Sequence, residues 1–362
     1  MAFSGIRVGL VGPLPPPSGG MANQTRQLAE LLRADHAEVT VVQTNPPYRL
    51  AWVGHVPVLR AVYRLFPYLW SVWHAAGQCN VMHIMANSGW SWHLFAAPAI
   101  WVSRLRGVPV IVNYRGGEAA QFLARAHGFV RLSMRRVAAL VVPSAFLREV
   151  FVKFDMPAAI VPNIIDLARF HPRAVRGDDS AHIVVARNLE LLYDNATALR
   201  AFQIVRSQMP GARLTIAGSG PDEQRLRDLA NELNLAASVH FAGRLERDAM
   251  AELYRGADVV LNPSLADNMP NSVLEALASG VPVVSTNVGG VPYIVQDGVT
   301  ALLVPPADSK AMASACLKIL SDYDLWRRLS AAGLVEVQRY TWQRVAPLLA
   351  GVYREAVTQA RH

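Results

Sequence analysis

Short runs of apolar and β-branched residues alternate with longer amphipathic stretches along the whole chain. Runs of this kind are typical of buried strands, and apolar positions at helical spacing predict helices. The predicted strands form two series: residues 6–10, 39–42, 81–84, 108–112 and 140–142, then 183–186, 214–217, 239–241, 259–261 and 281–284. Helix-length segments between them include residues 21–32, 144–154, 196–207, 221–233 and 248–255. This alternation predicts an α/β chain with two doubly wound parallel sheets that carry helices on both faces.

A polar segment separates the two series of strands. Residues 171–180 read His-Pro-Arg-Ala-Val-Arg-Gly-Asp-Asp-Ser and break both periodicities. We therefore predict an N-terminal domain over residues 1–172 and a C-terminal domain over residues 173–342. A length of 362 residues agrees with two domains. The carboxyl ends of parallel strands are the usual ligand-binding edge, so the two Rossmann-like sheets are expected to face a central cleft.

The net charge of +8 is concentrated in the first half of the chain. Residues 1–172 hold 16 Lys and Arg against 7 Asp and Glu, which gives +9, and the remaining residues hold 19 against 20, which gives −1. A basic surface favours an anionic partner: a phosphorylated substrate, an anionic membrane surface or nucleic acid. No nucleic-acid recognition motif accompanies the charge, so we expect no nucleic-acid partner.

The two cysteines and the hydropathy pattern indicate a cytoplasmic protein. Cys79 and Cys316 match neither a metal-ligand spacing nor a disulfide framework, which favours a reducing compartment. Residues 1–11 carry too short an apolar run for a secretory signal, and no run reaches the ~18 apolar residues of a membrane span. Asp322 and Asp324 have a metal-binding spacing but lie between two helical patterns, so we interpret them as a helix boundary and expect no metal.

The sharpest chemical signal lies in residues 262–290. A loop with the acid Asp267 leads into a helix that begins near Asn271, and Glu275 lies in its first turns. Backbone N–H groups at such a helix start attract phosphate, and two nearby carboxylates can hold the hydroxyl groups of a sugar or ribose. The alternative is structural: Asp267 and Asn271 cap the helix while Glu275 favours its dipole.

This segment resembles the signature of the retaining glycosyltransferases of family 4, which are two-domain enzymes of the GT-B fold. The family motif is an acid, seven residues and a Glu, then Ala-x-Ala-x-Gly-x-Pro-Val-Val and a Gly-Gly turn. Asp267 and Glu275 have this spacing, although the first acid of the family is usually Glu. Segments 216–221, 241–245 and 254–258 also look like family segments.

The resemblance implies transfer of a sugar from a nucleoside-diphosphate sugar, with no cofactor and no metal. It implies that the last helix, residues 343–362, crosses back to the N-terminal acceptor-binding domain, while the C-terminal domain binds the donor. The implied catalytic residues are Asp267, Glu275 and Arg115. The implied donor-binding residues are Gly19, Gly20, Arg187, Gly218, Arg244, Leu245, Asn268, Met269, Pro270, Asn271 and Ser272.

Two departures from the family pattern concern positive charge at the donor. Family members commonly place a Lys about five residues after the Arg that binds the diphosphate, but residues 188–197 contain no lysine and hold Tyr193 and Asp194 instead. Arg115 occupies the place of a family histidine beside the reacting sugar, and an arginine cannot act as a base at neutral pH. These departures keep a second hypothesis open: a non-catalytic partner that binds sugar nucleotides.

The glycine-rich segments admit other interpretations. Gly218 and Gly220 match part of a dinucleotide fingerprint, but Glu223 replaces its third glycine, which disfavours a dehydrogenase. Residues 12–20 follow the first predicted strand, where glycines let a backbone approach a ligand, and a solvent loop is the alternative.

Residues 48–101 combine six of the eight tryptophans with arginines. Aromatic rings beside cations suit the membrane interface, whereas aromatic positions at helical spacing also suit a buried helix. The residues concerned are Arg49, Arg60 and Arg64, flanked by Trp52, Tyr63, Phe66, Tyr68, Trp70 and Trp73. With the charge excess they predict a glycan or lipid-linked acceptor and peripheral attachment to the inner face of the cell membrane.

Overall fold

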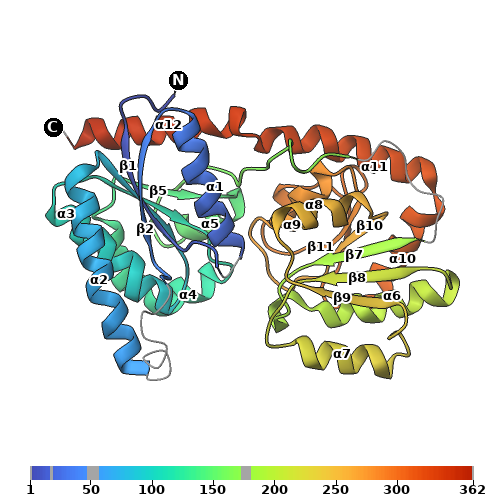
Figure 1. Ribbon diagram of the computed structural model, residues 1–362. Coiled ribbons are helices and arrows are strands. Elements are labelled where there is room, and N and C mark those ends of the chain that lie inside the picture. Colours follow the sequence, from blue (N-terminus) through green and yellow to red (C-terminus); the bar gives the residue numbers. More distant parts are fainter. Residues whose placement is uncertain (1, 17–18, 47–56, 173–180, 361–362) are drawn as a thin grey trace. The chain divides into compact units, whose positions relative to one another are not determined.

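The chain divides into two compact units (Figure 1). The N-terminal unit comprises Met1–Asn163 with Trp342–His362, and the C-terminal unit comprises Ile164–Thr341. The computed structural model describes residues 2–16, 19–46, 57–172 and 181–360, and the side chains of 57–64 lie outside the description.

The N-terminal unit is built on one parallel sheet with the strand order β2-β1-β3-β4-β5-β6. Its strands are β1 (Arg7–Gly12), β2 (Glu38–Gln43), β3 (Val81–Ala86), β4 (Val110–Tyr114), β5 (Ala139–Val142) and β6 (Ala159–Ile160). Its helices are α1 (Gly20–Ala34), α2 (Pro57–Gln78), α3 (Ala97–Leu105), α4 (Ala119–Met134), α5 (Ala145–Val152) and α12 (Trp342–Gln359). Every residue of β3 and β4 is buried, as expected of central strands covered by helices on both faces.

The C-terminal unit contains a second parallel sheet with the order β12-β11-β10-β7-β8-β9. Its strands are β7 (His182–Ala186), β8 (Arg213–Ala217), β9 (Val239–Gly243), β10 (Val259–Asn262), β11 (Val283–Thr286) and β12 (Leu302–Val304). Its helices are α6 (Asn195–Gln208), α7 (Glu223–Glu232), α8 (Arg247–Arg255), α9 (Asn271–Ala278), α10 (Ser309–Ser321) and α11 (Tyr323–Glu336). Two doubly wound parallel sheets confirm the predicted fold class.

The last helix, α12, belongs to the N-terminal unit, as predicted. Phe3 stacks on Trp342 with ring centroids 5.5 Å apart and meets Tyr353 edge-on at 5.6 Å. Tyr353 is fully buried, and α12 packs against β3 and β4. The aromatic residues of α12 therefore fix this helix to the first sheet.

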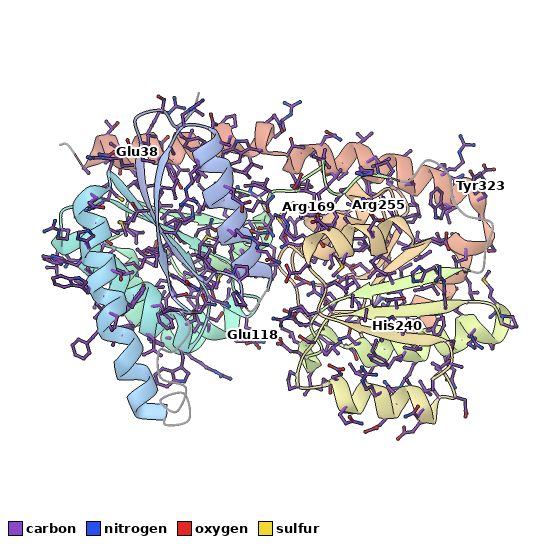
Figure 2. All side chains as sticks on the ribbon, viewed as in Figure 1. Glu38, Glu118, Arg169, His240, Arg255 and Tyr323 are labelled. Carbon is purple, nitrogen blue, oxygen red and sulfur yellow. The ribbon has the colours of Figure 1, made fainter. Side chains whose placement is uncertain are left out.

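The units divide between Asn163 and Ile164, whereas the sequence placed the boundary at residues 172/173. Residues 164–172 lack a secondary-structure pattern, yet they pack on the C-terminal unit. Phe170 is buried against Tyr254, and Arg169 pairs with Asp248 at 2.7 Å. Figure 2 labels Arg169 beside Arg255, which donates to the Arg169 carbonyl. The polar residues 173–180 lie outside the described residues.

Candidate active site

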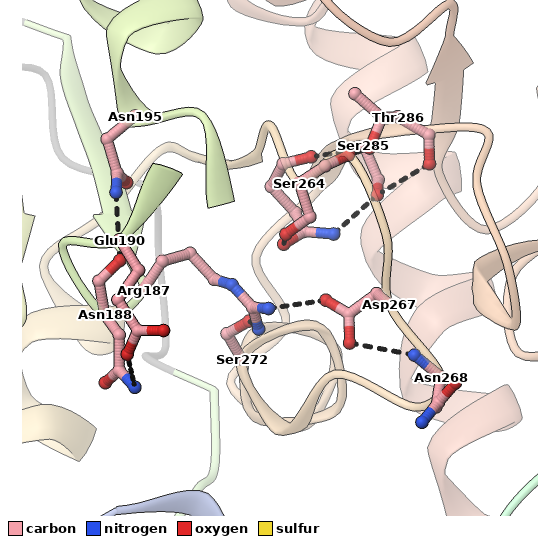
Figure 3. Close-up of polar contacts among 11 residues, drawn as sticks. Arg187, Asn188, Glu190, Asn195, Ser264, Asp267, Asn268, Ser272, Ser285 and Thr286 are labelled. Carbon is pink, nitrogen blue, oxygen red and sulfur yellow. Dashed lines mark hydrogen bonds and ion pairs between the residues drawn. The ribbon is translucent and has the colours of Figure 1, made fainter. Parts of the chain in front are cut away.

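The strand order of the C-terminal sheet reverses between β7 and β10, and the loops after these two strands carry the strongest predicted site residues. Ligands of open α/β sheets bind outside the carboxyl ends of strands at such a reversal. Arg187 directly follows β7, and Asp267 lies in the loop between β10 and α9. The structure brings these two side chains into contact (Figure 3).

Arg187 is held in place by three neighbours. Its Nη2 donates to Asp267 Oδ2 at 2.6 Å, and its Nη1 donates to Ser272 Oγ at 3.3 Å. The guanidinium also lies over the Tyr193 ring, 4.1 Å from its centroid. Its buried Nε has no hydrogen-bond partner within the described part of the chain. The side chain therefore offers a fixed cation with an unused donor.

Asp267 is bound within its own loop rather than to the helix start. Its Oδ1 accepts from the Asn268 N–H at 3.0 Å, and its side chain is 12% exposed. Burial raises the pKa of this carboxyl above its ordinary range, and Arg187 opposes the shift. The N-cap residue of α9 is Pro270, whose side chain makes no capping hydrogen bond, and Asn271 lies inside the helix as its first residue. The capping interpretation of Asp267 and Asn271 is therefore wrong.

Glu275 projects from the second turn of α9, and it accepts a hydrogen bond from the Tyr254 hydroxyl at 3.2 Å. Burial raises the pKa of Glu275 to about 7, against the opposing effects of Tyr254, Arg247 and Arg187. The carboxyl group is therefore poised between its neutral and charged forms near neutral pH.

Two glycine turns hold the β10–α9 loop and the β7 loop in position. Gly289 has φ +53, and a Cβ there would lie 2.1 Å from the Asp267 carbonyl oxygen. A Cβ on Gly290 would lie 1.7 Å from the Asn268 carbonyl oxygen, so only glycine permits this approach. Gly218 has φ +154 and would place a Cβ 1.9 Å from the Arg187 carbonyl oxygen. Glycine at this position therefore lets the turn after β8 pass close to the backbone of Arg187.

A buried polar network at the ends of β10 and β11 supports the Asp267 loop, and no sequence pattern predicted it. Asn262 Nδ2 donates to Ser285 Oγ at 2.9 Å, and Ser264 Oγ donates to Asn262 Oδ1 at 3.1 Å. Thr286 Oγ1 donates to the Ser264 carbonyl oxygen at 2.6 Å (Figure 3). The network ties the start of the loop to the neighbouring strand.

The other predicted donor residues of this unit lie near the same sheet edge. Arg244 and Leu245 directly follow β9, and Arg244 is exposed. Asn268, Met269 and Pro270 are buried in the loop before α9. Gly19 and Gly20 lie instead in the N-terminal unit, where Gly20 begins α1 and a Cβ on either residue would meet no described atom within 4 Å.

Arg115 lies in the N-terminal unit, directly after the central strand β4. Its Nε donates to Asn113 Oδ1 at 3.1 Å, and its Nη1 donates to Asn163 Oδ1. Burial lowers the pKa of Arg115 to about 9, so the side chain is a cation at neutral pH. The amide contacts hold it at the carboxyl end of the strand.

Sequence reasoning missed the partners of these site residues. Tyr254 lies on α8, 21 residues before its partner Glu275, whereas Tyr193 lies on a short 3-10 helix only six residues after its partner Arg187. No sequence pattern around Asn113 or Asn163 distinguishes an amide that holds Arg115 from an ordinary loop asparagine. The one available signal was Tyr193, at the place of the missing family lysine.

The helix α2 has one buried and one exposed aromatic face. Tyr68 and Val72 are buried, whereas Phe66, Trp70 and Trp73 are 72%, 72% and 41% exposed. Their spacing of four and three residues puts these three side chains on one face, which we call the aromatic stripe. The buried-helix interpretation thus holds for the face with Tyr68 and Val72, and the membrane-interface interpretation stays a prediction for the aromatic stripe. Arg49 and Trp52 lie outside the described residues, as do the side chains of Arg60, Tyr63 and Arg64.

The described residues hold neither a helix that could span a membrane nor a cluster that could bind a metal. None of the helices there has the length and apolar character needed to cross a membrane. Within those same residues, no group of three or more His, Cys, Asp or Glu side chains is arranged to hold a metal ion. Asp322 accepts from the Leu325 N–H as the N-cap of α11, which confirms its assignment to a helix boundary.

Comparison with known proteins identifies relatives for both halves of the chain. The family model named Glycosyltransferase Family 4 matches residues 18–169, and the one named Glycosyl transferases group 1 matches residues 183–322. A phosphatidyl-myo-inositol mannosyltransferase of Mycolicibacterium smegmatis is 27% identical over 96% of this chain and 93% of its own length. A D-inositol 3-phosphate glycosyltransferase of Saccharomonospora viridis is 33% identical over 54% of this chain, and the chain spans only 50% of that relative.

Solved structures match the complete fold. Sucrose-phosphate synthase from Thermosynechococcus elongatus has a TM-score of 0.77 at 21% identity, with coverage of 98% of this chain and 100% of that chain. HepE from Anabaena, in complex with UDP, has a TM-score of 0.75 at 15% identity, with coverage of 96% and 99%. At these identities the structures show the fold alone. The two family models together match most of the chain and show that it belongs to the family 4 glycosyltransferases, and the solved structures show that it has the GT-B fold.

Proposed function

We propose that the chain is a retaining, metal-independent glycosyltransferase that uses a nucleoside-diphosphate sugar. The observation that carries the proposal is the cluster of Arg187, Asp267, Ser272 and Glu275 at the strand reversal of the C-terminal sheet. It joins a cation, the start of helix α9 and two carboxyl groups. The relative HepE was solved with UDP, which supports a nucleotide donor.

In this proposal the donor diphosphate binds between Arg187 and the start of α9. The Nε of Arg187, which has no partner among the described residues, supplies one donor, and backbone N–H groups at Asn271 and Ser272 supply others. These donors stabilise the charge that develops on the leaving diphosphate, as oxyanion-hole donors do. Asp267 holds the donor sugar, and Glu275 accepts hydrogen bonds from the ribose hydroxyl groups.

The proposed transfer takes place on one face of the donor sugar. The bond between the anomeric carbon and the diphosphate oxygen breaks, and the oxygen keeps the electron pair. The acceptor hydroxyl oxygen bonds to the same face of that carbon, and its proton passes to the departing phosphate oxygen. No side chain is required as a base, which is consistent with an arginine at position 115.

Variants that change the length of the side chain at position 267 provide a further test of the proposal. Asp267→Glu restores the usual family residue and keeps a carboxylate beside Arg187, so we expect it to retain most transfer. Asp267→Ala removes the ion pair and should lose most transfer, measured as nucleoside diphosphate release with acceptor. Equal losses in the two variants would mean that the shorter reach of aspartate is required.

We further propose a lipid-linked acceptor at an anionic membrane, with the N-terminal unit as the attached part. The aromatic stripe of α2 supports this, because exposed aromatic rings rest at headgroup depth. Arg106 lies 4.7 Å from the Trp73 ring centroid, and neighbouring Leu105 is 76% exposed. The phosphatidyl-myo-inositol substrate class named for the mycobacterial relative supports a lipid acceptor.

Vesicle sedimentation tests this attachment. We expect the wild type to sediment with phosphatidylglycerol vesicles at low salt and less at high salt, because charge attraction is screened within ~10 Å at 0.1 M. Replacing both Phe66 and Trp70 by Ser should abolish sedimentation. The matched control replaces exposed Val299 and Val335 of the C-terminal unit by Ser. A wild type that stays in the supernatant at low salt contradicts membrane attachment.

Donor identification tests the proposed function itself. The purified chain is incubated with UDP-, GDP- and ADP-sugars and with polyprenyl-diphosphate-linked glycans, and mass spectrometry follows the nucleotides. We expect one nucleotide sugar to be consumed in the presence of an acceptor. Tight binding with no turnover on any acceptor would favour the alternative, a non-catalytic sugar-nucleotide-binding partner.

A further inference from the structure

A row of hydrogen-bonded polar side chains, which we call the polar row, runs through the core of the N-terminal unit and ends at Arg115. Tyr353 Oη lies 2.8 Å from His83 Nδ1, and His83 Nε2 lies 3.1 Å from Asn113 Nδ2. Asn113 Oδ1 accepts from Arg115 Nε at 3.1 Å, and Asn163 accepts from Arg115 Nη1. Exposed fractions are 0% for His83 and Tyr353, 1% for Asn113 and 6% for Asn163.

The chemistry of these side chains fixes the direction of every hydrogen bond in the polar row. Arginine only donates, so the oxygen of the Asn113 amide faces Arg115 and its NH2 group faces His83. That NH2 group only donates, so Nε2 of His83 accepts. Burial lowers the pKa of His83 to about 3, and the positive charge of Arg115 contributes a smaller part of this shift. The ring is therefore neutral. A neutral ring that accepts at Nε2 carries its proton on Nδ1 and donates to Tyr353.

The polar row is placed where it can serve a function that core packing does not require. An apolar side chain would fill the position of His83 between β3 and α12 without desolvating a polar ring, which costs free energy. The ring instead accepts from the amide that holds Arg115, the one cation on this strand end that the proposed function uses. We propose that His83 is a positioning residue, which orients Arg115 toward the substrate through the Asn113 amide.

This inference rests on the proposed function, because it assigns Arg115 a role in sugar transfer. Orientation by His83 requires an acceptor atom at Nε2 and nothing else of the ring. His83→Gln keeps an acceptor oxygen for Asn113 and a donor for Tyr353, whereas His83→Leu keeps the volume and removes both. The two variants thus separate positioning from packing.

Kinetics with the nucleotide sugar that the wild type consumes form the first test. We expect His83→Leu to lower kcat by roughly tenfold or more, because a small misplacement of a substrate-orienting group is costly. The donor KM should change little, since most of the predicted donor residues, including Arg187, Asp267 and Glu275, lie in the C-terminal unit. His83→Gln should recover most of the wild-type kcat. In an Arg115→Ala background, His83→Leu should cause no further loss, because nothing remains to be positioned.

A second pair of variants covers the case in which His83→Leu does not fold. Tyr353→Phe removes only the hydroxyl at the end of the polar row farthest from Arg115, and it should lower kcat by a smaller factor than His83→Leu does. Tyr68→Phe is the matched control, because it removes another buried hydroxyl, bonded to the Phe95 carbonyl at 2.8 Å. We expect Tyr68→Phe to keep the wild-type kcat. Equal kcat values in the two tyrosine variants overturn the inference, as do equal values in the two His83 variants.

Nitrogen NMR provides a readout that needs no substrate. In protein labelled with 15N-histidine, the signals of His83 are those absent from His83→Gln. We expect a neutral ring with its proton on Nδ1 from pH 5 to pH 8. Titration of the His83 ring near pH 6.5, or a proton on its Nε2, overturns the proposed hydrogen bonds of the polar row. A wild type that consumes no donor removes the proposed function and this role with it, whereas normal kcat in His83→Leu removes the role alone.

Discussion

Glu275→Gln is expected to abolish most sugar transfer while it leaves the chain folded. The substitution keeps the volume of the side chain and removes the charge that accepts from the donor ribose. A hydrogen bond to a charged group contributes ~1.5 to 3 kcal/mol, so donor affinity should fall roughly 10- to 150-fold. Nucleoside diphosphate release and titration calorimetry measure the two effects. Near-normal transfer with near-normal donor affinity would contradict the role of Glu275.

The same variant should be more stable than the wild type at pH 8. Folding raises the pKa of Glu275 from 4.5 to about 7, so the folded chain holds this proton more tightly than the unfolded chain. Stability therefore falls as the pH rises from 4.5 to 7, and the loss is complete above pH 7. Glutamine does not titrate and escapes this loss. Thermal unfolding at pH 4 and pH 8 checks it: the gain in Tm should appear at pH 8 and vanish at pH 4.

Arg187→Ala should weaken binding of a nucleoside diphosphate far more than binding of the nucleoside alone. The guanidinium is the one cation that follows β7 within residues 187–197, so no lysine replaces it. We expect a loss on the order of tenfold to a hundredfold for the diphosphate, measured by titration calorimetry. Equal losses for both ligands would make Arg187 a structural residue.

A control separates the lost cation from the carboxyl group that it leaves behind. Removing Arg187 leaves Asp267 partly buried without its 2.6 Å partner, which itself destabilises the loop. The double variant with Asp267→Asn removes that unpaired charge. If the double variant regains stability but not diphosphate affinity, the affinity loss belongs to the guanidinium.

The fold was predictable because parallel strands buried on both faces leave continuous apolar runs. The ten predicted strands all occur, and no end is shifted by more than two residues. The strands β6 and β12 were not predicted, because two and three residues are too few to show a pattern. The domain boundary shifted because Phe170 packs on the C-terminal unit although its neighbours in sequence are polar.

The candidate site was predictable only where its residues lie on one stretch of chain. Asp267, Ser272 and Glu275 share a loop and a helix start, so spacing alone put them together. The contact of Arg187 with Asp267 spans 80 residues, and the contact of His83 with Tyr353 spans 270. Such contacts depend on strand order and on where a distant helix packs. No local pattern encodes them.

The most direct test of the proposed function is proton NMR of the reaction of the wild type with its donor and acceptor. We predict that each nucleoside diphosphate released is matched by one new glycosidic bond, and that its anomeric proton shows the configuration of the donor. Glu275→Gln should give neither signal. Inversion at the anomeric carbon would contradict the retaining mechanism, and a donor that remains bound and intact with every acceptor would contradict transfer itself.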